Sequence, residues 1–114
     1  LLAAMNTSSP RIHPMADIVV NHRGGTTNWT DFTNPTWDCS SITSTDEANF
    51  GTISGYRPCG TPDTGDDFNG GRDLDHNNLQ VQNGVKEYLT LLKDIGFGVI
   101  RCIIYILFNC KHFF

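Results

Sequence analysis

A short apolar run that stops abruptly at three polar residues constrains this chain more than any other feature. Residues 15–20 are apolar except for Asp17, and Asn21, His22 and Arg23 follow them directly. A continuous apolar run of this length is typical of a strand in a parallel sheet, where both faces of the strand are covered. We therefore expect a buried parallel strand over residues 15–20 that ends in a polar loop.

A helix and a second apolar segment follow late in the chain. Asn77 or Asn78 can cap the start of the helix, and Gly96 can end it. Residues 97–100 and 103–108 are apolar and rich in β-branched side chains, which predicts a second buried strand around 97–104. The apolar residues of the helix recur at the spacing of one helical face: Val81, Val85, Tyr88, Leu89 and Leu92.

The order of strand, long excursion, helix and strand predicts one βαβ unit with a large insertion after its first strand. The insertion, residues 24–75, is rich in Thr, Ser, Asn, Gly and Asp, yet aromatic residues recur through it. A structureless loop of this length is unusual in a compact domain, so the segment is either disordered or a small excursion domain. The recurring aromatic residues favour the excursion domain, because disordered segments contain few of them.

Length and charge exclude several classes of protein. A chain of 114 residues is long enough for one small domain but far short of a complete (β/α)8 barrel, which needs about 250 residues. The net charge is −4 and the basic residues are scattered, which argues against a nucleic-acid surface. No apolar run approaches the roughly 20 residues of a membrane helix. Residues 1–5 are too short for a signal peptide, and we read the start as cut from a longer chain, which leaves the cellular location unassigned.

Four cysteines leave alternatives open. Cys39 and Cys59 flank a polar loop and are either a disulfide or two free thiols. Cys102, Cys110 and His112 could suggest a metal site, but their apolar surroundings and loose spacing argue against it.

An acidic segment forms the sharper chemical signal. Residues 61–76 hold five carboxylates and one Arg, with Gly65, Gly70 and Gly71 among them. Ca²⁺ takes about six to eight oxygen ligands, readily from Asp, and glycines allow the bends that bring such ligands around one ion. A solvated acidic loop is the other interpretation. An EF-hand is excluded, because a loop starting at Asp63 has Phe68 where Gly is required.

The ordered set of segments resembles the alpha-amylase family of glycoside hydrolases. Residues 15–23 resemble the conserved block at the third barrel strand, 24–76 the calcium-binding domain B that this family inserts there, and 77–104 the third barrel helix and fourth strand. The resemblance implies an α/β fold, a fragment of a TIM (β/α)8 barrel with an inserted irregular, β-rich domain B. Residues 1–14 are then an irregular lead, and 105–114 match nothing in the family.

The resemblance also implies a calcium site. Asn21 matches a calcium ligand of the family, whereas an isolated Asn would indicate only a possible ligand for a hard cation. Asp66 stands where the family uses a backbone carbonyl, so its side chain is additional. The calcium-ligating carboxylates match Asp63, Asp67 and Asp73.

Two further positions match substrate-binding residues. His22 matches the residue that contacts the sugar on the non-reducing side of the cleaved bond, although a lone His at a strand end is more often a structural hydrogen-bonding residue. Arg101 matches the Arg that orients the nucleophile. Two residues later, where the family has its nucleophilic Asp, this chain has Ile103, and Gly98 replaces another Asp of that block.

The implied activity of the family is retaining, calcium-dependent hydrolysis of internal α-1,4-glucosidic bonds, with starch, glycogen or malto-oligosaccharides as the α-glucan partner. We predict that this chain is inactive, because Ile103 replaces the nucleophile and the family's acid/base Glu would lie beyond residue 114. Two alternatives stay open: a related hydrolase that acts on other α-glucosides, and a non-catalytic calcium-binding or sugar-binding module.

Overall fold

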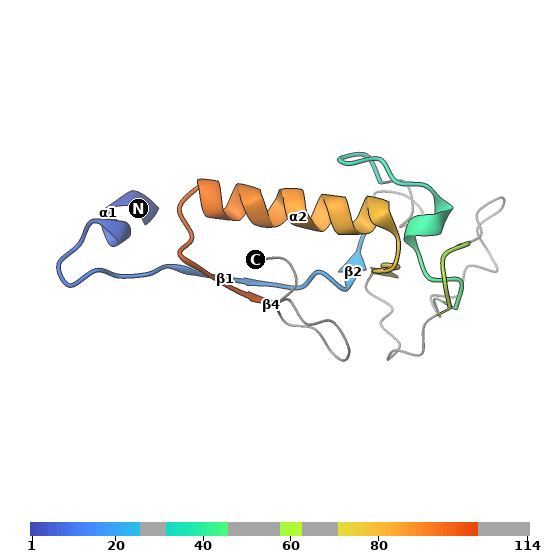
Figure 1. Ribbon diagram of the computed structural model, residues 1–114, viewed down its shortest axis with the longest axis horizontal. Helices are drawn as coiled ribbons and strands as arrows, with labels where there is room; N and C mark the ends of the chain where they lie inside the picture. Colours follow the sequence, from blue (N-terminus) through green and yellow to red (C-terminus); the bar gives the residue numbers. More distant parts are fainter. Residues whose placement is uncertain (26–31, 46–57, 63–70, 103–114) are drawn as a thin grey trace.

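The computed structural model describes residues 1–25, 32–45, 58–62 and 71–102. Figure 1 shows a long helix lying along a narrow sheet, with η1 and the described residues around it near one end of the helix. The described elements, in chain order, are α1 (Leu2–Asn6), β1 (Met15–Ile18), β2 (His22–Arg23), the 3-10 helix η1 (Cys39–Ser41), β3 (Arg72–Asp73), α2 (Leu79–Asp94) and β4 (Val99–Cys102).

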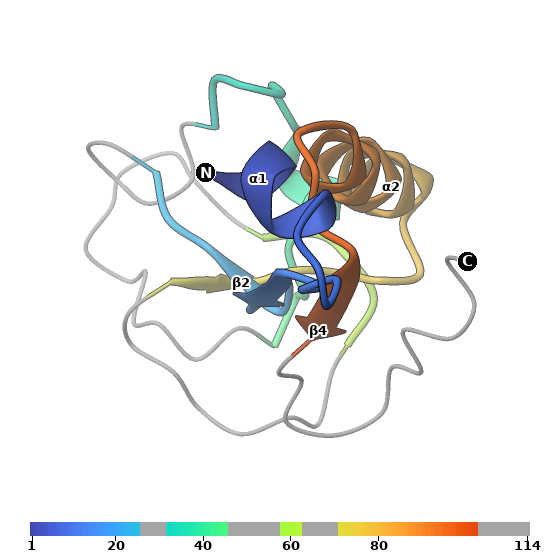
Figure 2. The same cartoon turned by 90° about the vertical axis from the view of Figure 1, so that its left-hand side faces the viewer.

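The predicted βαβ unit is confirmed. β1 and β4 pair in parallel, with a register that runs from Met15 opposite Val99 to Ile18 opposite Cys102. Both views place α2 over one face of this pair (Figures 1 and 2). Both strands are shorter than expected within the described residues, and positions 103 and 104 lie outside them. The closed barrel stays a prediction, since two strands are compatible with many parallel sheets.

The core lies between this sheet and α2. Ala16 and Ile18 alternate with exposed neighbours along β1, so they point toward the helix. Ile100 and Cys102 of β4 pack against the same cluster from the neighbouring strand. The helix contributes the residues that its spacing predicted, with the exception of Tyr88, which is exposed: Val81, Val85, Leu89 and Leu92.

The ends of α2 agree with the sequence signals. Asn78 is the N-cap, and its side chain accepts a hydrogen bond from the Gln80 backbone N–H at 2.8 Å. After the last helical turn Gly96 takes a φ of +112°, a conformation that favours glycine, and its N–H donates to the Lys93 carbonyl at 3.0 Å. The choice between Asn77 and Asn78 is therefore settled in favour of Asn78.

The irregular lead expected over residues 1–14 is corrected in its first part, where Leu2–Asn6 forms the short helix α1. The segment contains Leu, Ala and Met, which are strong helix formers, and both prolines lie after it. Asn6 donates a side-chain hydrogen bond to the Gly96 carbonyl at 2.7 Å, which fixes α1 to the end of α2. Among the described residues, no helix has the length and apolar character needed to cross a membrane.

Gly84 has a packing role, although Gly inside a helix costs about 1 kcal/mol relative to Ala. A Cβ atom built on Gly84 would lie 2.4 Å from Cζ2 of Trp37. The indole of Trp37 therefore lies directly on the helix backbone, and it reaches there from the chain before η1. The absence of a side chain at position 84 is what lets the excursion pack against α2.

We predict that Gly84→Ala destabilises the protein even though Ala is the better helix former by about 1 kcal/mol. Displacing Trp37 from its place on the helix should cost about 1–3 kcal/mol and outweigh that gain. Urea unfolding monitored by far-UV circular dichroism measures the balance. In a Trp37→Ala background the same change should become stabilising, and a destabilisation of equal size in both backgrounds would contradict the proposed contact.

Candidate functional site

A short antiparallel ladder brings the end of the excursion back to the end of β1. β2 pairs with β3, with His22 opposite Asp73 and Arg23 opposite Arg72. The backbone N–H of Leu74 donates to the Asn21 carbonyl at 2.9 Å and continues this ladder. Residues about fifty positions apart are thus held side by side at the carboxyl end of the first strand.

This ladder gathers three of the predicted site residues around one buried carboxylate. Asp73 is only 3% exposed. Its Oδ1 accepts a hydrogen bond from the Asn21 side-chain amide at 3.3 Å and contacts Nε2 of His22, a contact that is an ion pair when His22 is protonated. A buried carboxylate is costly unless it is paired and hydrogen-bonded, so these contacts explain how Asp73 is accommodated.

The Asn21–His22–Asp73 group fits part of a calcium site. Calcium prefers carboxylate and amide oxygens, and Asn21 and Asp73 supply one side chain of each kind in direct contact. To share a cation with Asp73, the Asn21 amide would have to turn its oxygen inward in place of its nitrogen. His22, being a nitrogen ligand, would remain beside the ion rather than bind it.

The other predicted ligands, Asp63, Asp66 and Asp67, lie outside the described residues. Within the described part of the chain, no cluster of three or more His, Cys, Asp or Glu side chains could hold a metal. The calcium site therefore stays a prediction that depends on the acidic segment.

Arg101 lies apart from this group. It forms an ion pair with Asp17, its register partner on β1. The hydrogen bond from the Arg101 guanidinium lowers the pKa of Asp17 and raises the pKa of Arg101 itself. The substrate role expected from the resemblance is thus not visible in its contacts, which are made to a neighbouring strand.

Asp75 is a buried carboxylate that the sequence did not distinguish from its acidic neighbours. It is 3% exposed and accepts hydrogen bonds from the Thr61 backbone N–H at 2.6 Å, the Thr61 hydroxyl at 2.8 Å and the Asn77 N–H at 2.9 Å. Gly60 permits this approach, because a Cβ there would lie 2.8 Å from Oδ2 of Asp75. Asp75 thereby fixes the start of the acidic segment beside the start of α2.

A disulfide also holds the chain just before the acidic segment. Cys39 and Cys59 are bonded, which settles the alternative left open by the sequence. Cys59 N–H donates to the Cys39 carbonyl at 2.9 Å, and the following residue continues with a bond from Gly60 to Ile42 at 2.8 Å. Cys102 is also disulfide-bonded, so it carries no thiolate for the metal site considered with Cys110 and His112, which lie outside the described residues.

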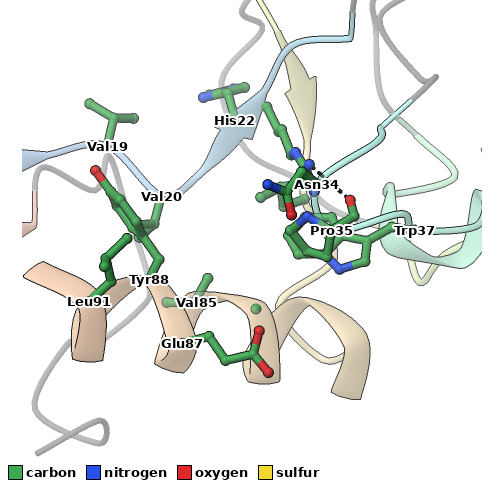
Figure 3. Close-up of a pocket in the computed structure, with 13 residues that line it drawn as sticks. Val19, Val20, His22, Asn34, Pro35, Trp37, Val85, Glu87, Tyr88 and Leu91 are labelled. Carbon is green, nitrogen blue, oxygen red and sulfur yellow. Dashed lines mark hydrogen bonds between the residues drawn. The ribbon is translucent and has the colours of Figure 1, made fainter.

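A pocket of about 480 Å³ lies between the end of β1 and the exposed side of α2. Figure 3 shows Val20, Tyr88 and Leu91 at one end of it and Pro35 with Trp37 at the other. This pocket could not be predicted from the sequence, because its two walls are far apart along the chain.

Arg23 forms the polar wall of this pocket. Its guanidinium stacks over the rings of Phe32 and Trp37, with centroid distances of 4.5 and 4.3 Å, and it donates to the Pro35 carbonyl at 2.9 Å. Partial burial lowers the pKa of Arg23. The stacking gives Phe32 and Trp37 of the excursion a packing role, and His22 lines the same pocket.

No protein-family model matches this chain. An assignment to a family therefore depends on the order of its motifs and on the geometry around Asp73.

We predict that Asp75→Ala destabilises the protein by about 2–4 kcal/mol, because hydrogen bonds to a buried charged group are lost together. Chemical denaturation of the full chain measures this change. Asp94→Ala, which removes an exposed carboxylate at the end of α2, is the matched control and should change stability by less than about 0.5 kcal/mol. Similar losses in the two variants would show that Asp75 has no special structural role.

Proposed function

We propose that this chain is a segment of an alpha-amylase-type glycoside hydrolase domain and contributes its calcium-binding part. The observation that carries the proposal is the contact of buried Asp73 with Asn21 and His22 at the carboxyl end of β1. Functional side chains of parallel α/β barrels lie at this end of the strands. β1 and β4 pair in parallel, and α2 comes between them along the chain. This βαβ arrangement supports the same assignment.

In this proposal Asn21, Asp63, Asp67 and Asp73 hold the calcium ion, and Asp66 adds negative charge beside them. Bound calcium would neutralise this carboxylate cluster and link the excursion to the first strand. Contacts among the described residues already hold both ends of the acidic segment. Asp75 and the Cys39–Cys59 disulfide hold the beginning of the acidic segment, and β3 holds its end.

The chain itself is proposed to lack hydrolase activity. Retaining glycosidases need two carboxylates about 5 Å apart, of which one attacks the anomeric carbon. Ile103 occupies the position of that nucleophile, and a hydrocarbon side chain can neither attack nor stabilise a developing positive charge. Activity toward α-1,4-glucans, or toward other α-glucosides, belongs in this proposal to the parent enzyme.

A second candidate is a non-catalytic calcium-binding or sugar-binding module. It is favoured by one specific observation: Asn21, His22 and Asp73 come together using contacts made entirely within this chain. The two candidates differ in whether His22 contributes to the binding of malto-oligosaccharides by the isolated chain.

We predict that calcium binds this chain and that Asp73→Asn weakens the binding at least about tenfold, equivalent to about 1.4 kcal/mol. The substitution preserves size and one acceptor oxygen but removes the negative charge of the ligand. Calorimetric titration of the full chain with calcium chloride gives both affinities. Asp94→Asn serves as the control with the same loss of charge at an exposed position remote from the acidic segment. Equal affinities in Asp73→Asn and in the unaltered chain would refute the assignment.

We also predict that the purified chain releases no reducing ends from soluble starch, because of Ile103. Release that an active-site-directed amylase inhibitor abolishes would contradict this prediction. Titration with maltoheptaose then separates the two candidates: binding that His22→Ala abolishes supports the module, and absence of binding supports the segment of a larger enzyme.

A further inference from the structure

The exposed position of Cys59 leaves the Cys39–Cys59 disulfide accessible to solvent. Cys59 is exposed and Cys39 is half-buried. Cys102 packs against the hydrophobic core, whereas neither of these two cysteines does so among the residues that the structure describes. A thiolate can break a disulfide only where it can reach one of the two sulfur atoms. Attack at Cys59 therefore does not require the core to open.

The segment that carries Cys39 continues into a pairing with β3 and the residue after it. Directly after η1, Ile42 forms an antiparallel bridge with Leu74, and Ile42 is completely buried. The next residue, Thr43, donates its backbone N–H to the Asp73 carbonyl at 3.0 Å. Since β2 pairs with β3 on its other side, the backbone at Asp73 is held between two segments.

The segment that carries Cys59 contacts the same region through a side chain. The Cys59 N–H donates to the Cys39 carbonyl at 2.9 Å. Two residues later, Thr61 donates its N–H and its hydroxyl to the Asp75 carboxylate. Each half of the disulfide is thus connected to residues 73–75, one by backbone pairing and the other by a buried carboxylate. The covalent link holds both segments against this short stretch of chain.

We propose that the Cys39–Cys59 disulfide is a redox-sensitive clamp on β3, and that dithiol reductants open it. One thiolate of the dithiol attacks Sγ of Cys59, forms a mixed disulfide and displaces Cys39 as a thiolate, which takes a proton from water. The second sulfur of the reductant, also as a thiolate, then attacks the mixed disulfide and releases Cys59. The reductant leaves as a disulfide, and the protein gains two electrons and two protons.

Opening the clamp removes the covalent constraint and leaves the hydrogen bonds around it. A single hydrogen bond contributes little net stability, so segments held only by such bonds open locally more often. We expect the contact of Thr61 with Asp75 and the bond of Thr43 to Asp73 to open, while α2 stays packed on its sheet. β3 is then held from the side of β2 alone.

The clamp makes the redox state a means of regulating the site around Asp73. This step rests on the proposed calcium function, whereas the clamp itself depends neither on calcium nor on the proposed family. Where Asp73 binds calcium, reduction lowers the calcium affinity, because this ligand is held less firmly. Thermodynamic linkage then requires calcium to make the disulfide harder to reduce by the same factor.

Amide hydrogen exchange on the full chain, followed by NMR, tests the clamp. Reduction with dithiothreitol should accelerate exchange of the Thr43 and Thr61 N–H groups at least about tenfold, because both donate to residues that the clamp holds. Exchange of the Leu89 N–H, in the middle of α2, should change by less than about twofold. Unchanged exchange at Thr43 and Thr61, or an equal acceleration at Leu89, would overturn the proposal.

The double variant Cys39→Ser with Cys59→Ser is the control, because it keeps the disulfide of Cys102. It should show the fast exchange without reductant, and dithiothreitol should cause no further change. A further acceleration would assign the effect to Cys102 and overturn the proposal. If circular dichroism shows this variant to be unfolded, alkylation and mass spectrometry follow the reduction of each cysteine in the unaltered chain. The acceleration must then coincide with the reduction of Cys59, and coincidence with Cys102 alone contradicts the clamp.

Titrations of the oxidised and the reduced chain with calcium chloride separate this inference from the proposed function. Reduction should lower the calcium affinity at least about fivefold. Saturating calcium should lower the equilibrium constant for reduction of the disulfide by the same factor in a dithiothreitol redox buffer. Equal affinities of the two forms would overturn the regulation of the site. Absence of calcium binding in both forms would instead contradict the proposed function, and hydrogen exchange would still decide whether the clamp exists.

Discussion

The antiparallel pairing of β2 with β3 is the constraint on which the rest of this structure depends. It returns the chain from the excursion to the point where β1 ended, with His22 beside Asp73. Closing so long a loop costs entropy, although this cost grows only slowly with loop length. Because the loop closes there, α2 begins at the carboxyl end of β1, runs back along the sheet and allows β4 to enter parallel to β1.

The closure is held by polar groups rather than by a large core. Asp73 accepts a hydrogen bond from Asn21, just after β1, and Asp75 accepts one from Thr61, where the acidic segment begins. The two residues are nearly adjacent in the sequence, yet their side chains bind to different segments of the chain. Each is buried, so removal of its partners would leave an uncompensated charge. The β2–β3 pairing is therefore specific, because a shift of one residue in its register would point Asp73 away from Asn21 and His22.

Elements coded by local patterns could be predicted from the sequence. The apolar spacing of α2 and the Asn78 cap identify a helix, and the apolar runs identify β1 and β4. β2 and β3 could not be found in this way, since two-residue strands have no periodicity and their pairing joins distant positions. Propensity also could not explain Gly84, a poor helix former, because the close approach of Trp37 that requires a residue without a side chain joins positions far apart in the chain.

The candidate site, too, could be predicted from the sequence only in part. Residue types and family resemblance pointed to Asn21, His22 and Asp73, and the fold brings these three together. Composition could not separate Asp73 and Asp75 from the remaining carboxylates, because burial, not residue type, distinguishes them. A local signal did exist for Asp75: an Asp whose side chain accepts from the N–H two residues later forms an Asx turn, and Asp75 with Asn77 has this spacing just before a helix cap.

Asp17 raises the complementary question of why a charge interrupts an otherwise apolar strand. Its contact with Arg101 is exposed, and exposed ion pairs contribute little to the stability of a monomer. The register of the sheet places Arg101 directly opposite Asp17, so each charge has a partner of opposite sign within reach. Side chains alternate between the two faces of a strand, so a shift of one residue between β1 and β4 would place the two charges on opposite faces of the sheet. The pair is thus better explained by the register that it favours than by the small stability that an exposed ion pair contributes.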